Sequence, residues 1–164
     1  MTIFQQIKYF KDDWLNEYQQ SELVKIIDFE IDNHICSFKT KYQSLIDQQL
    51  RYHDNQIIQI ICTKFQKLID KSFDQKTKIL TCWFVMVKKD SQFQYHVHKG
   101  SSFTGVYFLK NCKDNGTIFK FDNLEVQTIC EDNTGIIFTS DLMHSTPTWK
   151  GADRYVVTVD LVKV

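Results

Sequence analysis

The apolar residues of this chain change their spacing near Asp74, and this change constrains the fold more than any other feature. Before Asp74 they recur at a helical period, and after it they alternate with polar residues in short segments separated by turn residues. Helices followed by many short strands favour an antiparallel sandwich or jelly roll with helices beside it. We therefore expect an α+β fold that is mainly β, with two N-terminal helices packed on one side.

Two helices are expected in the first half of the chain. Asp12 or Asp13 can cap the first, which would extend to about Ile31. Asp54 or Asn55 can cap the second, whose apolar side chains follow one continuous stripe. That stripe consists of Ile57, Ile58, Ile61, Phe65, Leu68, Ile69 and Phe73. Outside the helices, residues 3–10 fit a strand, residues 38–42 a short strand or a loop, and residues 44–50 a helical turn.

The strand expected over residues 78–88 carries apolar side chains on both faces. One face would hold Cys82, Phe84 and Met86, and the other Trp83, Val85 and Val87. A strand of this kind is typically covered on both sides, here by a helix and by a cavity. Further strands are expected over residues 93–98, 103–109, 117–121, 124–129, 135–138 and 154–162.

Charge and cysteine content narrow the classes of partner. The 20 basic and 20 acidic side chains balance, and no dense basic run is present. Nucleic acid is therefore not an expected partner, because its binding depends on many phosphate-neutralising side chains. The sequence shows neither a signal-peptide pattern nor an apolar stretch of about 20 residues, so we expect a cytoplasmic protein with no membrane partner. Its five cysteines lack a CxxC spacing and fit buried thiols in a reducing compartment.

Three histidines have the spacing of metal ligands. His96 and His98 are two positions apart, so they would leave the strand at residues 93–98 on the same side. His144, which follows the strand at 135–138, can complete three ligands on one face of a metal ion and leave the opposite positions open. Any one of these histidines alone would also fit an ordinary surface or core position.

Arg154 follows His144 by ten positions (154 − 144) and opens the last strand. Its guanidinium can hold a carboxylate through two parallel hydrogen bonds, although its position would also fit a strand-end residue paired with Asp153 or Asp160. Thr104 and Tyr107 lie on opposite faces of the strand at 103–109, so only one of these faces would line a cavity.

The order of motifs in residues 93–162 resembles the double-stranded β-helix core of the 2-oxoglutarate and Fe(II)-dependent oxygenases. The likeness is to the prolyl-hydroxylase-like branch and to small oxygenases of phages and marine bacteria. That family has H-x-D, a tyrosine-bearing strand, G-x-L-x-F, G-x-x-x-F-x-S-x-x-x-H, and an Arg or Lys about ten residues later. The matching segments here are His96-Val97-His98, Val106-Tyr107-Phe108-Leu109, Gly116-Thr117-Ile118-Phe119-Lys120-Phe121, Gly135 through His144, and Arg154-Tyr155-Val156-Val157-Thr158-Val159.

The resemblance implies a single domain with a cupin-like jelly-roll core at residues 77–164 and a helical support region at 1–76. It implies Fe(II) held by His96, His98 and His144, and 2-oxoglutarate held by Arg154. Thr104 and Tyr107 are further candidates for cofactor binding, and ascorbate is a candidate auxiliary reductant. The implied reaction hydroxylates a small-molecule or peptidyl substrate and releases succinate and CO2.

This chain departs from the family at His98, where the family's motif has an acid. Three neutral imidazoles would hold Fe(II) with one negative charge fewer. Only one of His96 and His98 would ligate if a carboxylate such as Asp122 or Asp141 entered the site instead. Another alternative is a cupin-like or three-histidine dioxygenase that does not use 2-oxoglutarate, although residues 99–103 lack the acid that cupins place after H-x-H. A third is a non-enzymatic β-sandwich that binds a ligand.

Overall fold

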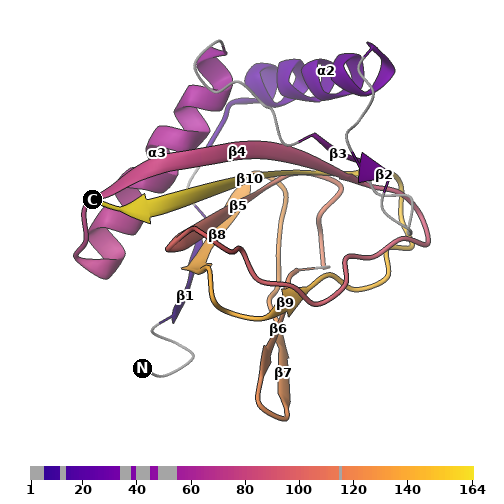
Figure 1. Cartoon of the computed structure of the whole chain (residues 1–164). Coiled ribbons are helices and arrows are strands. Elements are labelled where there is room, and N and C mark those ends of the chain that lie inside the picture. Colours follow the sequence, from indigo (N-terminus) through magenta and orange to yellow (C-terminus); the bar gives the residue numbers. More distant parts are fainter. Residues whose placement is uncertain (1–5, 12–13, 34–37, 40–44, 48–54, 115) are drawn as a thin grey trace.

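The computed structural model describes residues 6–11, 14–33, 38–39, 45–47, 55–114 and 116–164. These residues form two helices, a seven-stranded sheet and a three-stranded sheet (Figure 1). The helices are α2 (Glu17–Asn33) and α3 (Gln56–Phe73). The large sheet has the order β1-β8-β5-β10-β4-β3-β2 and the small sheet the order β7-β6-β9. Their strands are β1 (Ile7–Phe10), β2 (Phe38–Lys39), β3 (Leu45–Asp47), β4 (Thr77–Val87), β5 (Phe103–Lys110), β6 (Ile118–Phe121), β7 (Leu124–Gln127), β8 (Thr134–Thr139), β9 (His144–Ser145) and β10 (Arg154–Lys163).

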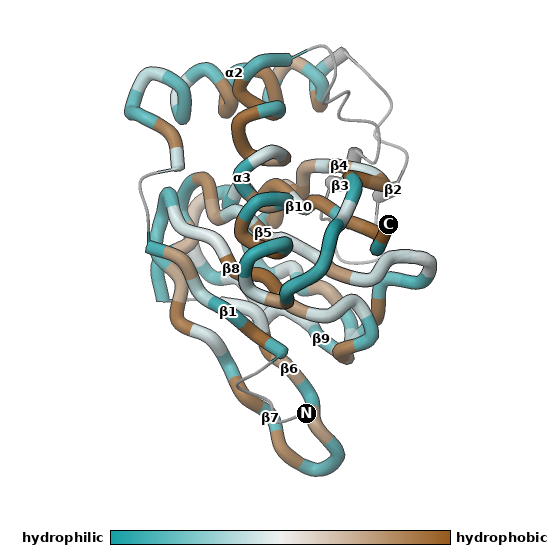
Figure 2. The backbone as a smooth tube through the Cα atoms, turned by 90° about the vertical axis from the view of Figure 1, so that its left-hand side faces the viewer, coloured by the Kyte–Doolittle hydropathy of each residue, from teal (hydrophilic) through white to brown (hydrophobic). Residues whose placement is uncertain are grey.

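The strand pairings of both sheets are antiparallel, as the short alternating segments predict. Both helices lie over one face of the large sheet, and the small sheet lies on the opposite side (Figure 1). Figure 2 shows the β6–β7 hairpin extending away from the helices. The predicted α+β class with helices on one side is therefore confirmed. No described helix combines the length and the apolar character that a membrane span needs.

Helix α3 begins where its sequence predicts. The side chain of Asn55 accepts hydrogen bonds from the backbone N–H groups of Ile57 and Ile58, at 2.9 and 3.2 Å, and so satisfies two donors of the first turn. The helix ends at Asp74, which adopts a left-handed conformation with φ 50°. Most of the predicted stripe is buried against the sheet, at Ile58, Ile61, Phe65 and Ile69.

Helix α2 begins later than predicted. The backbone N–H of Gln19 donates to the side chain of Asn16 at 2.8 Å, and the side chain of Gln19 accepts from the backbone N–H of Asn16 at 3.0 Å. This reciprocal pair caps the helix at Asn16, so the prediction of a start at Asp12 or Asp13 is wrong. Those two aspartates lie outside the described residues. Trp14 and Leu15 are apolar and would continue the helical pattern, but they are buried ahead of the helix.

The two faces of strand β4 divide as predicted. Cys82, Phe84 and Met86 belong to a core that contains α3, whereas Val85 and Val87 belong to a second core beneath the large sheet. The second core is continuous with a cavity, which the same two valines help to line. The large sheet is therefore a wall between a helix-packed core and a cavity.

Two further local predictions differ from the structure, and one short strand was not predicted. Residues 93–98 are not a strand but an irregular segment that makes a single bridge, between His96 and His144. Residues 44–50 contain a strand, β3, in place of the predicted helical turn, because this segment pairs with the edge of β4. Strand β9 was not predicted, since its two residues are too few to show any periodicity.

Replacing Gly105 with alanine is expected to destabilise the fold. A Cβ atom at this position in β5 would overlap the ring of Phe65 from α3, so helix and sheet would have to separate. We expect Gly105→Ala to lower the free energy of unfolding by about 1–3 kcal/mol in urea titrations. The double variant Gly105→Ala/Phe65→Leu should lose less than the sum of its two single variants, because the smaller side chain makes room. Additive losses would contradict this packing.

Candidate metal centre

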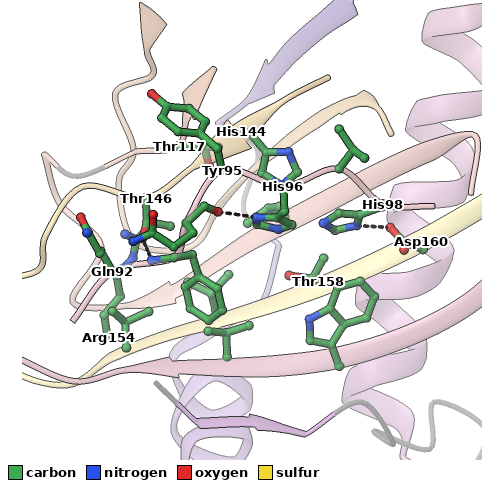
Figure 3. A pocket seen from close by; sticks show the side chains of 18 residues that line it. Gln92, Tyr95, His96, His98, Thr117, His144, Thr146, Arg154, Thr158 and Asp160 are labelled. Atoms are coloured by element: carbon green, nitrogen blue, oxygen red, sulfur yellow. Dashed lines mark hydrogen bonds and ion pairs between the residues drawn. The ribbon is translucent and has the colours of Figure 1, made fainter. Parts of the chain in front are cut away.

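The three predicted histidines converge on one point from two separate parts of the chain (Figure 3). Their rings are 4.3 Å apart for His96 and His144, 5.0 Å for His98 and His144, and 5.3 Å for His96 and His98, measured between centroids. One nitrogen of each ring lies within 4.8 Å of the others, a spacing that one metal ion can bridge. These residues could therefore hold a metal.

Backbone hydrogen bonds fix this convergence. The N–H of His96 donates to the carbonyl of His144 at 2.9 Å, and the N–H of His144 donates to the carbonyl of His96 at 3.0 Å. The N–H of His98 donates to the carbonyl of Ser140 at 3.0 Å. Backbone hydrogen bonds therefore join residues 93–98 at two points to residues 140–144. Both imidazoles of the H-x-H motif reach the same centre without forming a continuous strand.

The rings of His96 and His144 are oriented through their Nδ1 atoms. Nδ1 of His96 lies 2.8 Å from the carbonyl oxygen of Gln94, and Nδ1 of His144 lies 2.8 Å from that of Leu142. A carbonyl oxygen only accepts, so each Nδ1 carries the proton and each Nε2 keeps a free lone pair. This is the tautomer that ligates a metal through Nε2.

Desolvation favours the same neutral form. Burial, with a smaller contribution from the nearby His96 ring, lowers the pKa of His144 to about 3. Burial is also the largest cause of the lowered pKa of His96. Both imidazoles are therefore uncharged near neutral pH, as a metal ligand must be.

The third ring, His98, is held by a carboxylate. Its Nδ1 lies 2.7 Å from Oδ1 of Asp160, which sits on β10. The same oxygen accepts from the hydroxyl of Thr104 at 2.7 Å, and that hydroxyl lies 2.8 Å from the hydroxyl of Ser140. The structure thus places Thr104, a predicted cofactor contact, behind the histidines, where it supports Asp160. The sequence pattern had offered Asp160 only as a partner for Arg154.

Tyr107, the other predicted cofactor contact, lies on the opposite face of the sheet. Its hydroxyl donates to the side chain of Asn133 at 2.7 Å, and its ring packs 5.4 Å from that of Trp14. Burial raises the pKa of this hydroxyl strongly. Tyr107 belongs to the helix-side core and not to the cavity lining, so its assignment to the site is corrected.

The alternative carboxylate ligands, Asp122 and Asp141, are not brought to the histidines. Both are exposed, and neither lines the cavity. Among the described residues, the group whose ligand atoms converge here consists of histidines alone.

A cavity of about 540 Å³ joins the histidines to Arg154, the predicted carboxylate-binding residue, which we call the anion clamp. Its floor is β10, where Arg154, Val156, Thr158 and Asp160 alternate toward the cavity. Arg154 and Asp160 therefore lie at opposite ends of one strand face, about 20 Å apart at roughly 3.3 Å per residue (Figure 3). The volume suits a small organic ligand.

Arg154 is buried with unsatisfied hydrogen-bonding capacity. Its side chain is 2% exposed and lies over the rings of Phe108 and Trp149, with centroid distances of 5.5 and 5.8 Å. Among the described residues, its Nε and Nη1 atoms have no hydrogen-bond partner. Asp160 binds His98 instead, and Asp153 pairs with a lysine, so neither pairs with Arg154. A buried guanidinium with two free donors is suited to a carboxylate ligand.

No family model matches the sequence, and no curated protein matches it. Solved structures match over nearly the whole chain. The viral collagen prolyl hydroxylase vCPH from Paramecium Bursaria Chlorella virus-1, in its 2OG complex, is 13% identical, with 94% of each chain covered and a TM-score of 0.71. An oxidoreductase of the 2OG-Fe(II) oxygenase family from Burkholderia pseudomallei is 13% identical, with 95% of this chain and 84% of that chain covered and a TM-score of 0.67.

HygX from Streptomyces hygroscopicus, with nickel and 2-oxoglutarate bound, is 9% identical. That match covers 99% of this chain and 87% of HygX, with a TM-score of 0.68. The chain therefore has the fold of the 2-oxoglutarate and Fe(II)-dependent oxygenases, as its motif order predicted. At these identities the likeness establishes the fold alone.

Loss of one histidine is expected to remove metal binding. Untagged wild-type protein should bind one Co(II) ion, measured by competition with a chromophoric chelator under anaerobic conditions. His96→Ala and His144→Ala should each weaken binding at least about 100-fold, since even the loss of a group that only orients a ligand costs roughly 10–100-fold. Met143→Ala, next to His144 but exposed, is the matched control and should bind as the wild type does. Unchanged affinity in the histidine variants would contradict the site.

Replacing Arg154 with methionine is expected to stabilise the ligand-free protein. Methionine fills a similar volume against the two aromatic rings and leaves no buried donor unpaired. We expect Arg154→Met to raise the free energy of unfolding in urea by about 1–3 kcal/mol, whereas Arg154→Lys should not. Added 2-oxoglutarate should raise the Tm of the metal-loaded wild type and leave that of Arg154→Met unchanged. A less stable Arg154→Met variant would show that the guanidinium is already satisfied.

Proposed function

We propose that this chain is a non-haem Fe(II) and 2-oxoglutarate-dependent oxygenase that hydroxylates a small-molecule or peptidyl substrate. One observation carries the proposal. A single cavity has three convergent imidazoles with free Nε2 lone pairs at one end and a buried arginine with two unpaired nitrogens at the other. The first group suits a divalent metal and the second a carboxylate.

His96, His98 and His144 would hold the Fe(II). When bound, Fe(II) supplies the redox chemistry that couples O2 to the 2-oxo acid, and the protein supplies position and environment. The overall reaction balances as 2-oxoglutarate, O2 and a C–H bond giving succinate, CO2 and a C–OH group. One oxygen atom enters succinate and the other enters the substrate.

Arg154 would hold the carboxylate at the far end of 2-oxoglutarate and so direct its 2-oxo acid end toward the histidines. The apolar side chains of Val85, Val87, Val106 and Val156 line the cavity together with Arg154. Because the guanidinium is buried, a charge-assisted pair with the carboxylate is stronger than it would be in water.

The proposal includes the jelly-roll interpretation of the fold, with a double-stranded β-helix core at residues 77–164 and a support region at 1–76. Strands β4 to β10 supply both sheets around the cavity, which supports this division. Strands β1, β2 and β3 of the support region extend the edges of the large sheet, which is consistent with one domain. The buried thiols at Cys62, Cys82, Cys112 and Cys130 are compatible with a cytoplasmic location.

A three-histidine dioxygenase that does not use 2-oxoglutarate is the second candidate. The observation in its favour is that the converging group contains no carboxylate. A three-histidine dioxygenase would have no role for the buried guanidinium of Arg154. The two candidates therefore differ in whether activity depends on Arg154.

The expected activity is succinate formation that depends on metal, O2 and 2-oxoglutarate. With Fe(II) and ascorbate present, wild-type protein should form succinate from 2-oxoglutarate even without its own substrate, at a slow uncoupled rate measured by mass spectrometry. Arg154→Ala should raise the KM for 2-oxoglutarate about 100-fold or more, because a charge-assisted bidentate pair is lost. Lys150→Ala, which removes an exposed cation from the preceding loop, is the matched control.

Two results would separate the candidates. Succinate formation that Arg154→Ala leaves unchanged would contradict the assigned clamp. Tight metal binding without succinate formation across a panel of substrates would favour the three-histidine dioxygenase.

A further inference from the structure

We propose that the carboxylate of Asp160, through its contact with Nδ1 of His98, supplies a negative charge to the metal site. An acidic ligand in place of His98 would carry that charge itself. Asp160 is a positioning residue in this account, since it acts on the metal through the imidazole. The inference rests on the proposed function only in requiring that the histidines bind a divalent metal. It assigns a role to a residue that the motif order does not include.

The contact itself is the first support. Oδ1 of Asp160 and Nδ1 of His98 are 2.7 Å apart, and both side chains are 9% exposed. The rings of His96 and His144 donate instead to neutral backbone carbonyls. Among the three histidines, His98 is therefore the one whose orienting partner carries a charge. A carboxylate in this place makes an imidazole a stronger electron donor to its metal.

Charge balance is the second support. Two imidazoles and one carboxylate around Fe(II) give a net charge of +1, whereas three imidazoles give +2. The carboxylate of Asp160 returns the total to +1 within the same buried region. An excess charge in a desolvated site is costly. The carboxylate of Asp160, which contacts a histidine of the metal site, would therefore stabilise the bound metal.

The placement of Asp160 is the third support. Its strand partner in β5 is Thr104, whose hydroxyl donates to the same Oδ1 at 2.7 Å. The pairing of β10 with β4 shifts register between Asp160 and Leu161, a type of irregularity that often re-aims a side chain. The carboxylate is thus fixed from two directions and directed at His98. In addition, β10 carries both the anion clamp and this compensating charge on one face.

The alternative is a purely structural role, in which Asp160 only links β5 to β10 through Thr104. A double-mutant cycle distinguishes the two roles. Asp160→Asn keeps the shape and an oxygen acceptor for Nδ1 but removes the charge. His98→Asp moves a carboxylate into the ligand position itself, so the charge at Asp160 is then no longer needed.

We expect Asp160→Asn to weaken Co(II) binding by roughly 10–100-fold and to shift the visible absorption bands of the bound Co(II). In the His98→Asp background, adding Asp160→Asn should leave Co(II) affinity unchanged or raise it, because two adjacent carboxylates repel. Affinity is measured by chelator competition, and urea unfolding of the metal-free proteins reports any structural loss. Asp90→Asn, an exposed carboxylate paired with Lys150, is the control for the loss of one negative charge.

Wild-type affinity in Asp160→Asn, or an equal loss of affinity in both backgrounds, would overturn the proposal. If Asp160→Asn alone does not fold, comparing His98→Asp with His98→Asp/Asp160→Asn supplies the test: a weaker double variant overturns the proposal. The readout is metal affinity, so its outcome is separate from turnover. If the Co(II) affinities of the variants follow this expectation but no succinate forms, the role of Asp160 is supported and the assignment as a 2-oxoglutarate-dependent oxygenase is not.

Discussion

The site depends on one pair of backbone hydrogen bonds, those that join His96 and His144 in both directions. These residues are 48 positions apart (144 − 96), and each bond fixes the chain at the point where an imidazole leaves it. Such long-range pairing is entropically costly to form, so it needs the sheets around it to be in place. The small sheet and the irregular segment at residues 93–98 therefore together hold the three histidines in place.

Strand β10 then organises everything that faces those ligands. Its alternate residues Arg154 and Asp160 point into the cavity, while Tyr155 and Val157 point into the helix-side core. One strand thus couples the packing of α3 against the sheet to the positions of the anion clamp and of the carboxylate behind His98. The cost of burying Arg154 with free donors is tolerated because the rest of this strand is well packed.

Much of the fold was predictable because it follows from local periodicity. The stripe of α3, its cap at Asn55 and the two apolar faces of β4 are properties of consecutive residues, and the structure confirms them. The start of α2 was mispredicted because Trp14 and Leu15, although buried by tertiary contacts such as that of Trp14 with Phe65, precede the helix and are not part of it. Residues 93–98 alternate like a strand, yet their backbone hydrogen bonds go to separate partners.

The sequence by itself determined which side chains were available for the site. The order and spacing of three histidines and one arginine were enough to predict a metal site and a carboxylate-binding residue. Only the tertiary structure decided which face of β5 meets the cavity, and so separated Thr104 from Tyr107. It also decided that a carboxylate 62 positions from His98 (160 − 98) would lie against its ring. The physical reason is that sequence period fixes the direction of a side chain relative to its own strand, whereas contacts between strands depend on register and on the packing of the whole sheet.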